Sequence, residues 1–312
     1  MYTQCHDALS VGIVLLVIIR RINMKIIKPS VEFFGSVPTD YENILRFIEM
    51  AGRTCYKSED KITADSAEGF VKRLISAGHL AMVEHSNFVV RANYSPNIWP
   101  LTQIVAMTGK YLNHFFDPER SSLYIGGSLT AWYQNCVQQG APSYCDPFME
   151  VYGHLFGGVE TGETEWQVCP HNKIPKALHR YSAKFICDRG VSHELVRHRP
   201  CSFAQESTRY VNYGGKDMEF IEPAGFEGWS PGNQQKFVNA CGRSEELYKA
   251  MLYGGLSLQQ ARAVLPNALK TEIIVTADAA EWAHIKKLRT HPSAHPDMVR
   301  VMNMMPWNDF LC

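Results

Sequence analysis

Residues 197–210 read RHRPCSFAQESTRY, and this stretch decides how the rest of the chain is interpreted. It combines three arginines and a histidine with short polar side chains and few large apolar ones. Arg197 and Arg199 flank His198, and a pair of guanidinium groups offers the planar donors that phosphates and imide carbonyls accept. Because Glu206 is the only carboxylate in the stretch, most of the positive charge is left for a ligand. The pattern predicts an anion-binding site rather than a solvated surface of ion pairs.

The composition is that of a globular protein with a sizeable core. The chain has 312 residues, 46% hydrophobic and 20% charged, which suits one large or two modest domains. Thirty-one basic residues balance thirty-one acidic ones, and a zero net charge argues against a nucleic-acid-binding module or a membrane-surface protein. The nine cysteines include no CxxC pair, so we predict neither a disulfide framework nor a zinc knuckle and expect a cytoplasmic location.

A short apolar run lies near the N-terminus. Residues 11–19 form a nine-residue apolar segment followed by two arginines. This is well short of the roughly 20 residues that span a bilayer, and a signal peptide would carry its charge before the apolar segment. We expect residues 1–23 to be an extension outside the fold, with Met24 as the natural start. The alternative is an ordinary terminal element that packs on the body.

Periodicity and capping residues predict a mixture of helices and strands, an α+β fold. The predicted helices are 41–52, 66–77, 231–253, 258–263 and 279–289, and the predicted strands are 24–35, 88–92, 218–223 and 271–277. Ser66 and the nearby glutamate are interpreted as a capping box, and Gly78 as the stop of that helix, which places His79 in a turn. Residues 123–135 are interpreted as a turn followed by an amphipathic helix.

The stretch 197–210 resembles the signature RHRxxSxNxxSxRY of the flavin-dependent thymidylate synthases, with Ala204 as its one departure, in place of asparagine. Three further blocks resemble segments of that family in the same order: GHLAMVEHSNF (78–88), QARAVLPNALKT (260–271) and LRTHPSAHPDM (288–298). In the family only a short segment separates the first block from the signature. The resemblance therefore implies one family-like domain over residues 24–312, with an ordered insertion at about 93–180.

The resemblance implies a fold with a mixed or antiparallel sheet, and a reaction. That reaction converts dUMP to dTMP, with 5,10-methylenetetrahydrofolate as carbon donor and NADPH-reduced FAD as hydride donor. No covalent protein nucleophile is expected. It also implies a homotetramer whose active sites draw on several chains, with small molecules as its partners and neither nucleic acid nor membrane among them.

The resemblance further assigns roles to residues at matching positions. The catalytic residue is Arg289, the cation expected beside the pyrimidine ring. The flavin-binding residues are His79, Arg197, His198, Arg199, Gln205, Asp278 and His284. The nucleotide-binding residues are Glu194, Arg197, Gln205, Ser207, Thr208, Arg209, Arg262 and Arg289. Several positions depart from the family: Asp278 and His284 replace asparagines, Ala280 replaces an arginine, and Cys55 replaces a serine that helps to hold the flavin.

Other interpretations stay open at this point. His79, His85, His193 and His198 suggest a metal site, but their spacing does not match zinc sites on a helix and no metal is expected. Cys201 adjoins two cationic residues that would lower the pKa of its thiol, which suggests a nucleophile. Arg289 could be a cation that only complements the end of its helix. A flavin-free, structural member of the family is a further alternative.

Overall fold

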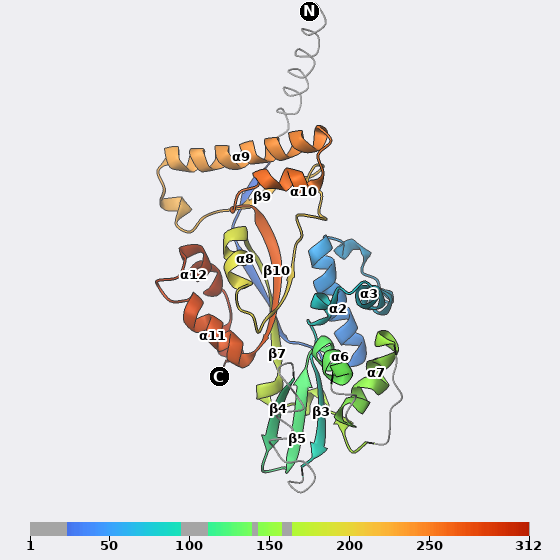
Figure 1. Ribbon diagram of the computed structural model, residues 1–312. Coiled ribbons are helices and arrows are strands. Elements are labelled where there is room, and N and C mark those ends of the chain that lie inside the picture. Colours follow the sequence, from blue (N-terminus) through green and yellow to red (C-terminus); the bar gives the residue numbers. More distant parts are fainter. Residues whose placement is uncertain (1–23, 95–111, 139–142, 158–163, 312) are drawn as a thin grey trace, which may run out of the picture.

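A computed structural model gives the fold over residues 24–94, 112–138, 143–157 and 164–311 (Figure 1). The expectation for residues 1–23 lies outside these described residues. Within them, no helix combines the length and apolarity that crossing a bilayer requires.

An antiparallel sheet forms the centre of the molecule. Its strands are β2 (Ser30–Ser36), β7 (Arg180–Asp188), β10 (Lys270–Asp278) and β8 (Ser202–Gln205), in the order β2-β7-β10-β8. β7 and β10 pair along their whole length, from Lys270 opposite Asp188 to Asp278 opposite Arg180. The predicted α+β class with an antiparallel sheet is confirmed.

Helices cover both faces of this sheet (Figure 1). One face packs on α8 (Arg189–Leu195), α11 (Ala279–Arg289) and α12 (Pro296–Met302), through a core that includes Phe185, Ile273, Val275 and Trp282. On the other face, Ala204 and Ile274 pack against α2 (Tyr41–Tyr56), which is followed by α3 (Ser66–Ser76) and α4 (Leu80–Val83). Both faces of β10 are buried, and its centre is the apolar run 273–275.

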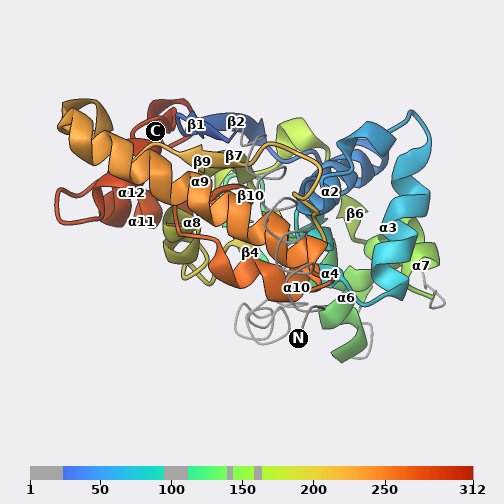
Figure 2. The same ribbon diagram turned by 90° about the horizontal axis from the view of Figure 1, so that it is seen from above.

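A smaller layer closes one end of the molecule. The strands β1 (Lys25–Ile27) and β9 (Glu219–Ile221) pair in parallel, and α9 (Pro231–Tyr253) and α10 (Leu258–Ala261) cover them (Figure 2). The predicted strand 24–35 is therefore two strands. Pro29 lies between them, and β1 and β2 pair with different partners.

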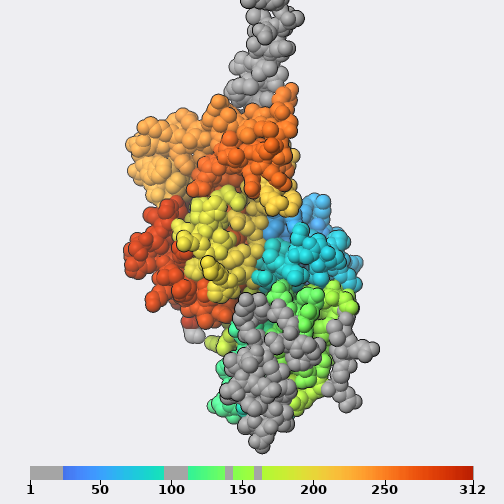
Figure 3. Space-filling model, in the orientation of Figure 1, coloured from blue at the N-terminus to red at the C-terminus, as the bar shows by residue number. Residues whose placement is uncertain are grey.

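A second sheet lies at the opposite end of the molecule (Figures 1 and 3). Its strands are β4 (Asn113–Asp117), β5 (Ser122–Gly127), β3 (Phe88–Asn93) and β6 (Gln167–Val168), in that order. The helices α6 (Leu129–Gln138) and α7 (Asp146–Phe156) cover one face, where Phe88, Trp132, Phe148 and Tyr152 pack together. Residues between 93 and 180 thus contain regular, packed elements.

Short 3-10 helices complete the described chain. They are η1 (Glu59–Lys61), η2 (Ser143–Cys145), η3 (His171–Lys173), η4 (Lys176–Leu178), η5 (Phe226–Gly228), η6 (Arg262–Val264) and η7 (Trp307–Asp309).

Most predicted elements are confirmed, and two local predictions are wrong. The turn expected at the start of 123–135 is strand β5, and only the helix that follows it is correct. The capping box expected at Ser66 does not form, because Ser66 lies inside α3 and its hydroxyl donates to Glu49 instead. A capping box does form at α10, between Ser257 and Gln260.

We predict that Trp132→Ala lowers the free energy of unfolding by about 3–5 kcal/mol. Trp132 is fully buried, and its indole nitrogen donates to the carbonyl of Phe88 at 2.8 Å, which ties α6 to β3. The matched control is Val137→Ala on the same helix, where the side chain is 62% exposed and a change within about 0.5 kcal/mol is expected. Chemical denaturation of both variants checks this. Equal effects would mean that the Trp132 contact does not hold the second sheet to its helices.

Candidate active site

The signature stretch forms the turn and the edge strand that follow α8. The side chain of Asp188 begins α8 by accepting from the backbone N–H of Val191 at 2.9 Å. After the helix, residues 196–201 turn the chain into β8, which pairs with β10 on one side. The stretch is therefore displayed at an open edge of the central sheet, and this region is visible at the surface in yellow (Figure 3).

Arg289 lies at the centre of a polar cluster between α8 and α11. Its Nη1 donates to Glu194 Oε2 at 2.6 Å, its Nη2 to the backbone carbonyl of Glu194 at 3.1 Å, and its Nε to His198 Nε2 at 2.9 Å. His198 Nδ1 in turn lies 3.0 Å from Glu281 Oε1. Three predicted site residues, Glu194, His198 and Arg289, are thus in direct contact.

The arrangement determines the protonation state of His198. A guanidinium nitrogen can only donate, so Nε2 must accept and the proton of the neutral ring lies on Nδ1, facing Glu281. Burial lowers the pKa of His198, and the charge of Arg289 adds to this effect, while Glu281 opposes it. A neutral imidazole is therefore the form that fits between Arg289 and Glu281.

The same cluster brings together three groups of the kind that bind metal ions. Ligand atoms of His198, Glu281 and His284 lie within 4.8 Å of one another. A metal ion needs a free lone pair on each ligand, whereas Nε2 of His198 accepts from Arg289 and Nδ1 carries the proton. The adjacent guanidinium charge also repels a cation. The donor pattern therefore favours an ion-pair network over a metal centre.

A second group of predicted residues lies around β8 and the start of η6. Gln205 Nε2 donates to Ser192 Oγ at 2.8 Å and to Thr271 Oγ1 at 3.2 Å. Arg262 Nη1 donates to Thr208 Oγ1 at 3.3 Å. These bonds leave the carbonyl oxygen of Gln205 and several donors of Arg262 available, so the group can bind a ligand that both donates and accepts.

Four predicted arginines, Arg197, Arg199, Arg209 and Arg262, are exposed. In the described part of the chain, none of them forms an ion pair with a carboxylate. The Arg209 guanidinium instead lies 5.4 Å from the ring of Tyr210. Unpaired guanidinium groups around a polar edge strand form a surface that attracts phosphates.

A pocket of about 470 Å³ adjoins this surface, between the central sheet and α6. Its lining includes Arg199 and Asp278, two of the predicted flavin-binding residues, together with Arg180, Glu84 and Ser202. Asp278 also begins α11 by accepting from the N–H of a residue in its first turn at 2.8 Å. The pocket therefore combines two guanidinium groups with carboxylates and a hydroxyl.

Arg197, one of the exposed arginines above, and His79 lie outside the two hydrogen-bonded groups. Within the described chain, the Arg197 guanidinium has no hydrogen-bond partner, and the His79 ring contacts Tyr56, whose hydroxyl is 3.2 Å from Nδ1.

Arg180 was not among the residues singled out from the sequence. Its guanidinium donates to the carbonyls of Glu84 and Ser86 and to Ser202 Oγ, and so joins the 78–88 block to the signature. An arginine at the start of a strand carries no local signal for this role.

The departures from the family pattern have structural correlates. Ala204 is fully buried against α2, where an amide would meet Ala51 and Ile274. Cys55 packs in the same cluster, burial raises the pKa of its thiol to about 12, and the thiol contacts the sulfur of Met82. Burial also raises the pKa of the Cys201 thiol, which disfavours a thiolate nucleophile there.

His85 lies beneath the signature as a fully buried, neutral side chain. Its Nδ1 contacts Thr276 Oγ1 at 2.8 Å, and the Thr276 hydroxyl donates to Ser182. Burial and the charge of Arg180 lower the pKa of His85 to about 3. His85 therefore holds the 78–88 block against the central sheet and is not a metal ligand on a surface.

The fold and the site together define an α+β protein in which exposed arginines and polar side chains surround the edge strand β8. Residues 176–306 match the family described as "Thymidylate synthase complementing protein". This region contains the signature and Arg289, and it is where the chain is similar to that family.

Several similar proteins carry the name flavin-dependent thymidylate synthase. The protein of Geobacter sulfurreducens is 39% identical over 101 residues, which are 32% of this chain and 43% of that protein. The protein of Thermococcus onnurineus is 34% identical over 105 residues, 33% and 42% of the two chains. The protein of Mycolicibacterium gilvum is 36% identical over 125 residues, and the match covers 35% of this chain and 48% of that protein. The chain thus spans less than half the length of these relatives.

Among solved structures, the chain is similar to a UMP/dUMP methylase, PolB from Streptomyces cacaoi, bound with 5-Br dUMP. The superposition has a TM-score of 0.40 with 17% sequence identity, and it covers 92% of this chain and 93% of the other.

We predict that His85 makes the protein sensitive to acid. Its pKa is about 3 in the folded state and near 6.5 when exposed, so below pH 6.5 the unfolded chain takes up a proton that the folded chain does not. The free energy of unfolding should fall with decreasing pH, by up to about 1.4 kcal/mol per pH unit from this residue. In His85→Gln the slope between pH 6.5 and 4 should be smaller, as measured by denaturant titration at several pH values. A slope equal to that of the parent protein would contradict the assignment.

Proposed function

We propose that the chain is a methyltransferase, a flavin-dependent thymidylate synthase that converts dUMP to dTMP. In this proposal 5,10-methylenetetrahydrofolate supplies the carbon and NADPH reduces FAD. The observation that carries it is the set of four arginines around the edge strand of residues 176–306, which have no carboxylate partner among the described residues. The phosphates of FAD and of dUMP are anions that such groups bind.

The described residues fit a flavin at the pocket beside Arg199. Arg199, Asp278 and Ser202 line this pocket, and His79, Arg197, Gln205 and His284 are proposed to complete the flavin site. When bound, the flavin would supply the hydride. Both ring nitrogens of His198 are already used by Arg289 and Glu281, so we infer that His198 positions Arg289. Ala280 offers no donor, and a flavin contact at that position is not proposed.

The nucleotide is proposed to lie between the two polar groups of the site. Arg209 and Arg262, with the hydroxyls of Ser207 and Thr208, would hold its phosphate and ribose, and Gln205 its base. Arg289 would face the uracil ring, where addition of hydride and a one-carbon unit places negative charge on the imide. A preorganised guanidinium stabilises such charge. Glu194 holds Arg289 from the opposite side.

We also propose a cytoplasmic homotetramer with shared active sites, and an insertion at about 93–180. Arg197, Arg209 and Arg262 are exposed in the single chain, so a second chain could cover them around a ligand. Mixing two variants that are inactive for different reasons, such as Arg262→Ala and Arg289→Ala, would restore partial activity if a site draws on two chains.

The central test uses the full chain reconstituted with FAD. The expected results are a yellow protein, oxidation of NADPH, and tritium release from dUMP labelled at C5. A colourless protein that cannot be reconstituted and releases no tritium would overturn the proposal and favour a structural, flavin-free role.

We predict that Arg289→Ala lowers dTMP formation by about 10²–10³, as expected for loss of a donor to developing negative charge. Arg289→Lys should also lose most activity, because an ammonium group lacks the planar fork that reaches both Glu194 and His198. Oxidation of NADPH by the bound flavin should change much less, since it does not involve the uracil ring.

The matched control is Lys287→Ala, which removes an exposed cation from the same helix end. If Arg289 acts only as a helix-end cation, both alanine variants should keep most of their dTMP formation. That result would refute the assignment of Arg289 to the pyrimidine.

A further inference from the structure

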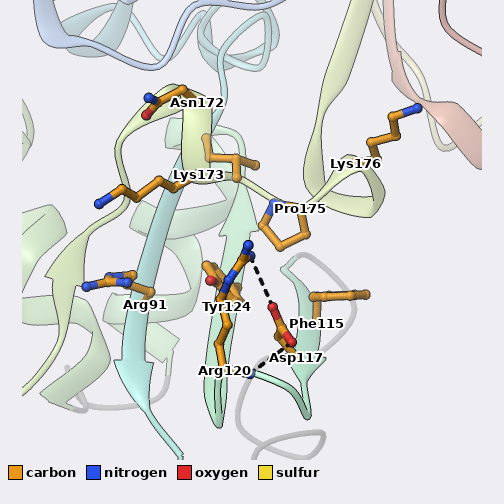
Figure 4. Close-up of a pocket in the computed structure, with 10 residues that line it drawn as sticks. Arg91, Phe115, Asp117, Arg120, Tyr124, Asn172, Lys173, Pro175 and Lys176 are labelled. Carbon is orange, nitrogen blue, oxygen red and sulfur yellow. Dashed lines mark hydrogen bonds and ion pairs between the residues drawn. The ribbon is translucent and has the colours of Figure 1, made fainter.

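The second sheet has a pocket of about 490 Å³ on the face opposite α6 and α7 (Figure 4). Arg91 of β3, Tyr124 of β5 and Phe115 of β4 lie side by side across three strands, because Tyr124 is the register partner of both other residues. Residues 172–176, between β6 and β7, form the upper rim. The pocket is distinct from the one beside Arg199, with which it shares no lining residue.

The pocket has an excess of positive charge. Four cationic side chains line it, Arg91, Arg120, Lys173 and Lys176, against the single carboxylate of Asp117. Asp117 pairs with Arg120 at 3.3 Å, and its Oδ1 also accepts two backbone N–H groups of the hairpin turn. In the described part of the chain, Arg91, Lys173 and Lys176 have no carboxylate within ion-pair distance. Asp117, the one carboxylate of the pocket, is thus already bonded to Arg120 and to the turn.

The partial burial of Arg91 distinguishes this pocket from a solvated surface of charged side chains. It is half-buried in the middle of β3, between Tyr124 on one neighbouring strand and Gln167 on the other. Beside it on the same sheet face, Val89 and Tyr124 are buried against Ile174 and Leu178. A guanidinium group that is partly removed from water without a counter-charge is unfavourable, so an anion in the pocket would stabilise it.

We propose that this pocket binds a small molecule with at least two adjacent negative charges, held by Arg91 and Lys173 with Arg120 beside them. The half-buried ring of Phe115 offers an apolar surface to a flat group attached to those charges. Phosphate groups and paired carboxylates share this chemistry. The proposal of an anion site rests only on the residues and charges of this pocket. Its assignment to one of two sources, a phosphate of NADPH or the glutamate carboxylates of the folate, rests on the proposed function.

The experiment is calorimetric titration of the full chain with inorganic pyrophosphate and with a triglutamate peptide. Arg91→Gln and Lys173→Gln should each weaken binding of the preferred probe by about tenfold or more, since a hydrogen bond to a charged group contributes about 1.5–3 kcal/mol. Lys173 is exposed, so its variant keeps the test valid even if Arg91→Gln folds poorly.

Two controls separate this pocket from other basic surfaces. Lys236→Gln removes an exposed lysine from α9 and should change binding less than twofold. Arg209→Gln alters the signature and should leave the component assigned to the pocket intact. Binding that is lost in Arg209→Gln but kept in the Arg91 and Lys173 variants would place the anion at the signature and overturn the inference, as would the absence of binding for both probes.

The two probes distinguish the sources. Tighter binding of pyrophosphate assigns the pocket to a phosphate ligand, and tighter binding of triglutamate assigns it to carboxylates. The result is independent of catalysis. A protein that binds either probe here but lacks flavin would refute the proposed function alone, whereas an active enzyme that binds neither probe would refute only this inference.

Discussion

The antiparallel pairing of β7 with β10 is the constraint on which the site depends. Each strand has nine residues and ends in an aspartate that begins a helix, Asp188 for α8 and Asp278 for α11. Because the strands run in opposite directions, these helices start at opposite ends of the sheet and run toward each other over the same face. Seven and eleven residues of helix extend about 10 and 16 Å, over a strand of about 30 Å. Their C-terminal ends therefore meet.

This meeting point is where Arg289 contacts Glu194. Two helix C-termini carry partial negative charge, and the guanidinium group lies between them, bonded to a carbonyl of one and projecting from the other. The electrostatic environment thus holds the cation in place before any ligand arrives. His198 contributes a neutral ring and Glu281 fixes its orientation. Arg289 does more than complement the end of its own helix, because its guanidinium group also bonds to Glu194 of α8.

Features encoded by nearby residues were predictable from the sequence. The bounds of α9 and α11 match the predictions 231–253 and 279–289, because Ser230 and Asp278 cap these helices where proline or small residues follow. The error at 123–135 came from interpreting a glycine pair as a turn. Gly126 lies inside β5, where a Cβ atom would come within 2.9 Å of the Val89 side chain. The glycine permits close packing, which depends on a partner distant in sequence.

The site was predictable only in its composition. The signature and the ordered blocks led us to predict Glu194, His198 and Arg289 as site residues. They did not predict the contacts among these residues, because α8 and α11 are brought together by strand pairing rather than by sequence proximity. Arg180 was missed for the same reason. Its three acceptors belong to two segments far away in the chain.

The position of β3 limits which deletions the fold can tolerate. β3 continues directly from the 78–88 block, and it is also an inner strand of the second sheet, bonded to β5 on one side and β6 on the other. Excising residues 94–179 would leave Phe88, Val89 and Val90, all fully buried now, as an apolar strand with two unpaired edges. Exposed edges of this kind recruit other chains. The pairing of β3 therefore ties the second sheet to the rest of the fold, and a single deletion that removed this sheet would create an aggregation-prone edge.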